Sequence, residues 1–503
     1  MTELSVIFQQ ITFAYARSSQ VLIRDLSVHF PRGWSGIVGA NGAGKSTILK
    51  LATGNLDPQR GIAAIPGSAI YCPQRTDHIP DHLLELLQAM DGDAFRIKGQ
   101  LGVAADWPER WPTLSHGERK RAQLAVALWR RPRVLAVDEP TNHLDTHARE
   151  LVFRALVRFK GVGLLVSHDR QLLDDLCAQC LFVDPPGAVL RPGNYSRGYQ
   201  QTQLDEVAAR KRRDLAKQDL LKLKRESASR RRAACRANQK RFKRGLAQKD
   251  HDAKSKIDLA RLSGKDGSAG RRLNQLKGRM SQAQAKLDRL KVKKTYQMGI
   301  WMPGAISKRD TLFTMPAGSL RLGATRLLDH PDLAMRPTDR IALCGANGSG
   351  KSTLVNHIIR SLTLAGDQVV YLPQEIDARM SRKILEAAKT LPHDVLGRMM
   401  TVVSCLGSRP RRLLESQRPS PGETRKILLA TGIAKAPHLI VMDEPTNHLD
   451  LPSIQCLEEA LAHCPCCLLL VSHDQRFLKA LTRIRWQISP HRRTNGKYIL
   501  ELV

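Results

Sequence analysis

Short apolar runs that end in acidic or polar residues occur twice along this 503-residue chain. Residues 134–137 and 439–442 are each four apolar residues followed by Asp-Glu, a pattern that predicts a strand buried on both faces. A further apolar run ends in Ser-His-Asp in each half, and its histidine follows the glutamate by 29 residues both times. The repeat predicts two copies of one α/β domain.

The middle of the chain has a helical pattern. From 200 to 244 it contains neither proline nor glycine and is rich in helix-forming residues, which predicts a long exposed helix. Further on, apolar residues alternate spacings of three and four, the seam of a coiled coil, at Leu273, Leu276, Met280, Ala283, Leu287 and Leu290. Between them, residues 251–272 hold Gly264, Gly267 and Gly270, which favour breaks and predict an antiparallel hairpin. Helices of about 25 to 45 residues would span roughly 40–70 Å.

A glycine-rich phosphate-binding pattern stands ahead of each Asp-Glu strand. Successive backbone N–H groups of such a loop surround phosphate oxygens, the lysine reaches the β- and γ-phosphates, and the serine hydroxyl binds Mg²⁺. The first copy is Gly39, Ala40, Asn41, Gly42, Ala43, Gly44, Lys45, Ser46 and Thr47. The second copy is Gly345, Ala346, Asn347, Gly348, Ser349, Gly350, Lys351, Ser352 and Thr353. Both copies are expected to bind a nucleoside triphosphate.

The residues at the ends of the apolar strands predict hydrolytic chemistry. Asp138 and Asp443 are expected to hold Mg²⁺. Glu139 and Glu444 follow them and are placed to orient and polarise the water that attacks the γ-phosphate, as general bases. A lone histidine after a strand is more often structural, but the identical spacing in both halves favours His168 and His473 as γ-phosphate sensors.

The order of these motifs resembles that of the ATP-binding cassette superfamily. Between each glycine-rich loop and its Asp-Glu strand stand a Q-loop, YCPQ at 71–74 and YLPQ at 371–374, and a signature, LSHGE at 114–118 and PSPGE at 419–423. NHLD follows each Asp-Glu strand, and a long charged segment joins two cassettes, as in the ABC-F subfamily of soluble ribosome-associated ATPases. The resemblance implies an α/β fold with two tandem ABC-type P-loop NTPase domains joined by a long antiparallel α-helical hairpin. It also implies that the Q-loop and signature residues bind ATP and its Mg²⁺, namely Gln74, Gln374, Ser115, Gly117, Ser420 and Gly422.

Two departures from the family pattern predict unequal ATP sites. The signature normally reads Ser-Gly-Gly, but His116 and Pro421 replace the first glycine. Proline has no N–H to donate, so the site of Lys45, completed by the second signature, should lose one phosphate contact. Tyr15 fits the adenine-stacking aromatic of the first cassette, with core packing as the alternative. Counting back from the second loop gives Arg321 at that place, and a guanidinium can also stack on a base.

Positive charge is concentrated in the middle of the chain. Residues 201–300 hold 30 Lys and Arg against 10 Asp and Glu, so they carry 20 of the 33 net positive charges. A solvated charged linker is the simpler interpretation, but charge of one sign at this density favours a polyanionic partner. Phe242 is the lone aromatic ring among the basic clusters, which favours backbone contact with structured RNA over base stacking. Ribosomal and transfer RNA fit best.

The predicted organisation is an ATPase domain over 1–196, a basic hairpin over 197–305 and a second ATPase domain over 306–503. No run of eighteen apolar residues occurs, and residues 1–5 lack a secretory signal, so we expect a cytoplasmic monomer without a membrane partner. The ten cysteines are interpreted as free thiols, although Cys177 and Cys180 have metal-like spacing.

The ABC-F resemblance implies a translation factor with ATP and Mg²⁺ as cofactors. Its ATP-bound closed form would bind the ribosome at the exit site, its hairpin would contact rRNA and P-site tRNA, and hydrolysis would release it. An antibiotic-protection factor of the same subfamily shares every motif and stays open as an alternative. A transporter ATPase subunit and a DNA-repair or chromosome-associated ATPase are more remote, and residues 249–263 at the hairpin tip would carry the specificity.

Overall fold

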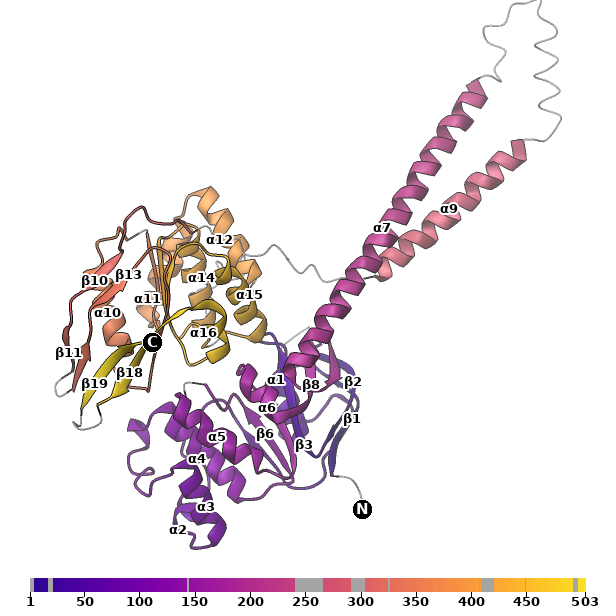
Figure 1. Ribbon diagram of the computed structural model, residues 1–503. Helices are drawn as coiled ribbons and strands as arrows, with labels where there is room; N and C mark the ends of the chain where they lie inside the picture. Colours follow the sequence, from indigo (N-terminus) through magenta and orange to yellow (C-terminus); the bar gives the residue numbers. More distant parts are fainter. Residues whose placement is uncertain are drawn as a thin grey trace, which may run out of the picture. The chain divides into compact units, whose positions relative to one another are not determined.

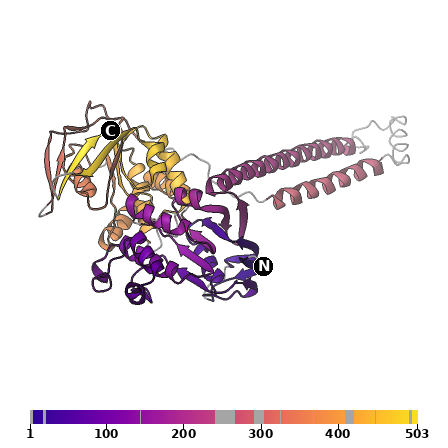
Figure 2. The same ribbon diagram turned by 60° about the horizontal axis from the view of Figure 1, so that its bottom comes forward.

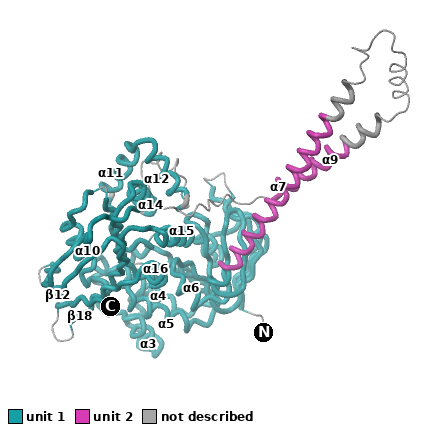
Figure 3. The backbone as a smooth tube through the Cα atoms, turned by 45° about the horizontal axis from the view of Figure 1, so that its top comes forward, with its two compact units in different colours: residues 1–198, 296–503 teal, residues 199–295 magenta. Residues whose placement is uncertain are grey.

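The computed structural model describes residues 4–16, 21–142, 144–239, 266–290, 304–323, 326–366, 368–406, 408, 420–447, 449–491 and 496–503. They form two compact units, one of residues 1–198 and 296–503 and the other of residues 199–295 (Figure 3). In the first unit, residues 1–198 are called the first half below and residues 296–503 the second half. The domain boundaries predicted at 196/197 and 305/306 stay predictions.

The first half is built on a six-stranded sheet in the order β5-β6-β7-β3-β8-β9 (Figure 1). All neighbours are parallel except β8 and β9. A three-stranded antiparallel sheet, β2-β1-β4, accompanies it. The strands are β1 (Ser5–Phe13), β2 (Ile23–Pro31), β3 (Gly33–Gly39), β4 (Arg60–Ala64), β5 (Ala69–Cys72), β6 (Val134–Asp138), β7 (Val162–Val166), β8 (Cys177–Asp184) and β9 (Gly187–Pro192). The helices are α1 (Lys45–Ala52), α2 (Leu83–Gln88), α3 (Gly92–Leu101), the 3₁₀ turn η1 (Trp111–Thr113), α4 (His116–Trp129), α5 (Thr146–Val157) and α6 (Arg170–Leu176).

The second half repeats the central order within an eight-stranded sheet, β11-β12-β19-β18-β14-β17-β16-β15, next to a small sheet of β10 and β13. Its strands are β10 (Phe313–Met315), β11 (Gly318–Leu322), β12 (Arg326–His330), β13 (Leu333–Met335), β14 (Arg340–Gly345), β15 (Val369–Leu372), β16 (Leu439–Asp443), β17 (Cys467–Val471), β18 (Ile484–Pro490) and β19 (Lys497–Leu502). Its helices are α10 (Lys351–Ser361), α11 (Ala378–Lys389), α12 (His393–Cys405), α14 (Pro421–Ile433), α15 (Leu451–Ala462) and α16 (Gln475–Leu481).

The order of the parallel strands explains why distant motifs meet. The glycine-rich loops follow β3 and β14, the histidines follow β7 and β17, the Asp-Glu pairs end β6 and β16, and the Q-loops follow β5 and β15. These four strands are successive neighbours in each sheet, so their carboxyl ends lie along one edge. The α/β fold with two tandem domains is confirmed.

The apolar runs form strands because they can be buried on both faces. Every residue of β6, β7, β16 and β17 is buried, in agreement with their unbroken apolar sequence. Gly163 shows how closely the core packs. It is paired with Trp34 of β3, and a Cβ at Gly163 would lie 2.4 Å from the Trp34 indole Cδ2.

The second unit is a helical hairpin. Most of α7 (Tyr195–Gln239) and all of α9 (Asp266–Arg289) belong to it, and the two helices lie side by side (Figures 1 and 2). The predicted seam is confirmed on α9 from Leu276 onward, where Leu276 is buried and Met280 and Leu287 are half-buried among exposed polar neighbours; the side chain of Leu273 lies outside the described part. The α7 seam was not predicted. It consists of buried and half-buried residues spaced seven, four, three and four positions apart, namely Ala209, Ala216, Leu220, Leu223 and Ser227.

One expectation about the hairpin was wrong. Gly267 and Gly270 do not break the second helix, because α9 begins at Asp266 and runs through both. Glycine lowers helix stability without forbidding the helix, and the apolar seam beyond these glycines supplies the packing. The basic cluster at 240–244, Gly264 and the predicted tip at 249–263 lie outside the described residues.

Candidate nucleotide sites

Both glycine-rich loops have the same conformation. Gly44 and Gly350 adopt φ angles of +96° and +97° immediately before α1 and α10, a region that favours glycine. Lys45 Nζ donates to the Gly39 and Ala40 carbonyls at 2.9 and 3.1 Å. Lys351 Nζ makes the matching bonds at 2.8 and 2.9 Å, to the carbonyls of Gly345 and Ala346. Each lysine is thus held inside its own loop at the N-terminus of a helix, the kind of place that favours phosphate.

Glu139 and Glu444, the two candidate general bases, are both buried and both have a strained backbone. Glu139 and Glu444 adopt left-handed φ angles of +47° and +51°. Their backbone N–H groups donate to the carbonyls of Val166 and Val471 in the neighbouring strand, each at a distance of 2.8 Å. Burial raises the pKa of Glu139 to about 8 and that of Glu444 to about 7. Carboxylates that titrate near neutral pH suit general-base work.

His168 and His473, the predicted γ-phosphate sensors and called the switch histidines below, lie against these glutamates. The Nε2 atoms of His168 and His473 lie 3.3 and 3.5 Å from Oε1 of Glu139 and Glu444. The backbone N–H of His168 donates to Glu139 Oε2 at 3.1 Å, and that of His473 to Glu444 Oε2 at 3.4 Å. Burial, aided by the charges of Lys351 and Arg149, lowers the pKa of His473 to about 3, so its ring is neutral. Each glutamate is thus paired with its predicted histidine.

A cavity of about 820 Å³ gathers the first set of predicted residues. The first half contributes Tyr15, Asn41, Gly42, Gly44, Lys45, Ser46, Thr47, Gln74, Asp138, Glu139 and His168. The second half contributes its signature residues Ser420 and Gly422, together with Asp450, which accepts a hydrogen bond from the Asn41 N–H at 2.7 Å. This cavity therefore has the two-sided composition expected from the motifs.

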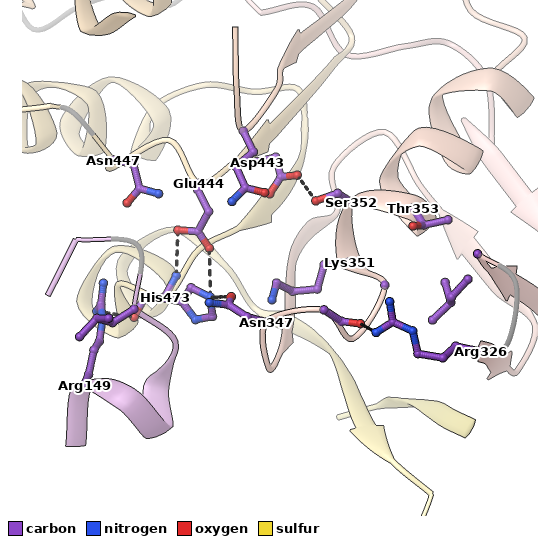
Figure 4. Close-up of a pocket in the computed structure, with 16 residues that line it drawn as sticks. Arg149, Arg326, Asn347, Lys351, Ser352, Thr353, Asp443, Glu444, Asn447 and His473 are labelled. Carbon is purple, nitrogen blue, oxygen red and sulfur yellow. Dashed lines mark hydrogen bonds and ion pairs between the residues drawn. The ribbon is translucent and has the colours of Figure 1, made fainter. Parts of the chain in front are cut away.

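A second cavity, of about 360 Å³, surrounds Lys351 (Figure 4). It is lined by the predicted residues Asn347, Gly348, Gly350, Lys351, Ser352, Thr353, Gln374, Asp443, Glu444 and His473. The first half contributes Leu144 and Arg149, whereas its signature residues Ser115 and Gly117 do not line this cavity. Arg149 was not predicted as a site residue.

The signatures have the same local structure despite their departures. Ser115 and Ser420 cap α4 and α14, and each forms a reciprocal capping box with the glutamate three residues on. Pro421 is the first residue of α14, a position at which a missing N–H leaves no helical hydrogen bond broken. The missing N–H of Pro421 therefore removes a hydrogen bond only from a ligand that would have accepted it.

The adenine-side residues differ between the halves. Tyr15 lines the first cavity with 47% of its surface exposed, so it is not a core residue, and its hydroxyl lies 2.9 Å from Thr47 Oγ1. Arg321 does not line the second cavity, whereas Arg326 does and donates to Gly348 O at 2.9 Å.

Arg321 therefore lies outside the second cavity, and Arg326, five residues further along the chain, is the arginine beside the second glycine-rich loop.

Comparisons with known proteins agree with the same division of the chain. The ABC transporter family model matches twice, over residues 23–142 and 328–447. The Ribosome protection protein VmlR of Bacillus subtilis is 28% identical, over 90% of this chain and 81% of its own length. The Tylosin resistance ATP-binding protein TlrC of Streptomyces fradiae is 30% identical, over 89% of this chain and 91% of its own length. The chain is an ABC-F protein.

A solved structure supports the fold of this ABC-F protein. The RNase-L Inhibitor has a TM-score of 0.62 with 19% identity, over 98% of this chain and 90% of its own. As an ABC-F protein, the chain binds and hydrolyses ATP. Among the described residues, no helix has the length and apolar character needed to cross a membrane.

The residues of the ABC-F sites fit a Mg²⁺–nucleotide. Ser352 Oγ donates to Asp443 Oδ2 at 2.6 Å, so the hydroxyl and carboxylate oxygens that Mg²⁺ prefers are adjacent. In the first site the Asp138 carboxylate instead accepts from the Tyr71 hydroxyl at 3.0 Å. Oε1 of Glu139 and of Glu444 is buried and makes no hydrogen bond to the described residues, so each can accept one from a water.

Two buried cations beneath the ABC-F signatures were missed by sequence reasoning. Lys120 of α4 is 0% exposed, and its Nζ donates to Pro73 O of the Q-loop at 2.7 Å and to Asp138 O at 2.9 Å. Arg425, at the same place in α14, donates to Pro373 O at 3.0 Å and Glu444 O at 2.9 Å. Each cation therefore joins a signature helix to the Q-loop and the catalytic strand of its own half. A cation two residues after each signature glutamate was the available signal.

Ion pairs join the two halves beside the sites. Arg170 Nη1 donates to Glu458 at 2.7 Å, and Arg476 Nη1 to Asp174 at 2.7 Å. Asp174 also accepts from the backbone N–H of Ser196, the second residue of α7, at 2.7 Å. Contacts of both halves therefore converge where α7 begins.

Most of the cysteines whose side chains are described are buried. Cys177 and Cys180 are buried free thiols in β8, and the described residues contain no group of three or more His, Cys, Asp or Glu arranged to hold a metal.

Proposed function

We propose that this protein is a cytoplasmic ribosome-associated ATPase whose ATP-bound, closed form binds the ribosome, at its exit site, and acts on translation through the basic hairpin. Hydrolysis then opens the cassettes and releases the protein. The observation that carries the proposal is the combination of two cassette sites with a helix of exposed cations.

The charges of α7 support RNA as the partner of the hairpin. Lys211, Arg212, Lys217, Lys222, Lys224, Arg225, Arg231 and Arg232 are all exposed along this helix. Arg210 and Arg230 pair with Glu206 and Glu226, each one turn earlier in the helix. Phosphate backbones release counterions when cations of this kind bind them, which favours rRNA and P-site tRNA as the partners.

The nucleotide chemistry is phosphoryl transfer to water. Glu139 and Glu444 would orient the attacking water through their carboxylates, with His168 and His473, which lie beside these carboxylates, sensing the γ-phosphate. Lys45 and Lys351 would exchange loop carbonyls for phosphate oxygens. Mg²⁺, when bound by Ser46, Gln74 and Asp138 or by Ser352, Gln374 and Asp443, supplies neutralisation of the phosphate charge. Pro421 leaves the first site one N–H donor short.

The proposal is tested by the effect of ribosomes on ATP hydrolysis. We expect ribosomes to stimulate hydrolysis by the full chain, and expect the stimulation to be lost when residues 201–295 are replaced by a short neutral linker. Stimulation by lipid vesicles or duplex DNA in place of ribosomes would instead support a transporter subunit or a DNA-associated ATPase.

Antibiotic protection is the second candidate, because VmlR is named for ribosome protection and TlrC for tylosin resistance. In a cell-free translation reaction inhibited by tylosin, a protection factor restores peptide synthesis when it is added with ATP. A factor that acts on translation itself changes the rate without the drug and gives no rescue.

A further inference from the structure

Arg149 brings a positive charge from the first half into the second ATP site. It lies on α5 and lines the cavity around Lys351, and its Nη1 donates to the backbone carbonyl of His473 at 3.1 Å (Figure 4). The same Nη1 lies 3.5 Å from Asp169 Oδ2, the residue that follows the first switch histidine. One guanidinium therefore contacts the switch segments of both halves.

One donor of Arg149 has no partner among the described residues. Its Nε is buried and makes no hydrogen bond to the described residues. The side chain is 23% exposed, so its charge is only partly screened by solvent. A fixed charge with a free N–H, beside a glutamate and a histidine at a phosphate site, matches the needs of phosphoryl transfer.

The first site has no counterpart at this helix position. Arg149 stands four residues after Asp145, the cap of α5, and Ile454 stands four residues after Asp450, the cap of α15. Ile454 is 1% exposed and packs in the core of the second half. The cation of the second half that does line the first cavity is Lys426, whose Nζ donates to Leu406 O of its own half at 2.6 Å.

The electrostatics of the two glutamates agree with this difference. Burial raises the pKa of both, but at Glu444 the charges of Lys351 and Arg149 oppose the rise, so that a residue of the other half acts on it. At Glu139 the opposing charges are those of Lys45 and Lys120, both from the first half.

We propose that Arg149 is a positioning residue of the second ATP site, supplied by the first half. It fixes the main chain at His473 and holds a permanent positive charge beside the carboxylate that orients the attacking water. Because Ile454 cannot do the same for the first site, the two sites hydrolyse ATP at different rates, and the second is the faster. The proposal concerns the cassettes alone, so it can be tested in the absence of any partner of the hairpin.

The test measures each site separately in the full-length protein. Glu139→Gln leaves the second site as the hydrolytic one, and Glu444→Gln leaves the first. Single-turnover ATP cleavage is measured in both backgrounds, with and without Arg149→Met. We expect Arg149→Met to lower the ratio of second-site to first-site rates about tenfold, the effect of one lost charge-assisted interaction. The KM for ATP of the second site should stay within about twofold, since Arg149 acts through His473 and Glu444.

Further variants separate charge, hydrogen bonding and folding. Arg149→Lys keeps the charge and should restore part of the rate, whereas Arg149→Gln keeps a donor without the charge and should not. Arg154→Met, on an exposed turn of the same helix where Arg154 pairs with Glu150 at 2.6 Å, is the matched control. Thermal unfolding of each variant reports folding directly.

Several results of these measurements would overturn the proposed role of Arg149. Equal losses in both backgrounds, no loss, or equal rescue by lysine and glutamine would overturn the proposal. So would a Glu139→Gln protein that cleaves no ATP, because the second site would then not act by itself. If Arg149→Met unfolds, the lysine and glutamine variants carry the comparison, and equal rates for these two refute it.

Discussion

Removing the Lys120 amine should weaken the first half by an amount that its contacts allow us to work out. Lys120→Met keeps a long apolar side chain but removes the donor to the buried carbonyl of Asp138 and to the carbonyl of the exposed Pro73. The unsatisfied buried carbonyl costs about 1–3 kcal/mol. Burial lowers the pKa of Lys120 to about 8, which shows that the protein bears a cost for the charge, and methionine removes that cost. We therefore expect a net loss of about 2 kcal/mol.

The assay is thermal unfolding monitored by circular dichroism. A loss of this size lowers the Tm of a domain of this length by roughly 4–8 °C. Arg119→Met is the matched control, because Arg119 also donates to two carbonyls, Trp111 O and Pro112 O, but is only half-buried. Water can replace its bonds, so its Tm should change by less than about 3 °C.

A conservative variant completes the test. Lys120→Arg places in the first half the residue that Arg425 provides in the second, and it should recover most of the stability. Since Lys120 holds the carbonyl of Asp138, Lys120→Met should also slow hydrolysis at the first site. Equal Tm shifts for Lys120→Met and Arg119→Met would refute the argument from the buried carbonyl.

Three further predictions concern other parts of the molecule. Gly163→Val should destabilise the protein by about 1–3 kcal/mol, because its Cβ meets the tryptophan indole beside it, whereas Gly187→Ala, with its nearest atom 3.8 Å away, should leave the Tm unchanged. Tyr15→Ala should raise the KM for ATP of the first site and Tyr15→Phe should not, as steady-state kinetics would show; equal effects would argue against stacking. Replacing the exposed Arg231 and Arg232 by glutamine should reduce the salt dependence of rRNA binding, with the slope of log K against log salt falling by about 0.7–0.9 for each lost phosphate contact, and an unchanged slope would remove these two residues from the interface.

Features that repeat or have a regular period could be predicted from the sequence. The glycine-rich loops, the Asp-Glu strands and the histidines were placed correctly beside one another, because parallel neighbouring strands bring their carboxyl ends together. The seam of α9 was visible through its regular spacing. The seam of α7 was hidden because dense charges separate its members, two of which are alanine and one serine.

The errors have equally physical causes. Arg321 was assigned by counting back from the second loop, but position along the chain does not say which side chain reaches the cavity, and Arg326 lines it instead. Arg149 was overlooked because it departs from the repeat, whereas the other site residues are those that the two halves share. Its role depends on a contact between residues 324 positions apart, which no local pattern reports.

The most direct test of the proposed function is co-sedimentation with ribosomes of a protein carrying both Glu139→Gln and Glu444→Gln. The account predicts that this protein pellets with ribosomes in ATP, stays in the supernatant in ADP, and no longer pellets in ATP when residues 201–295 are replaced by a short neutral linker. Recovery with ribosomes that is independent of nucleotide and hairpin, or recovery with membranes or DNA instead, would contradict it.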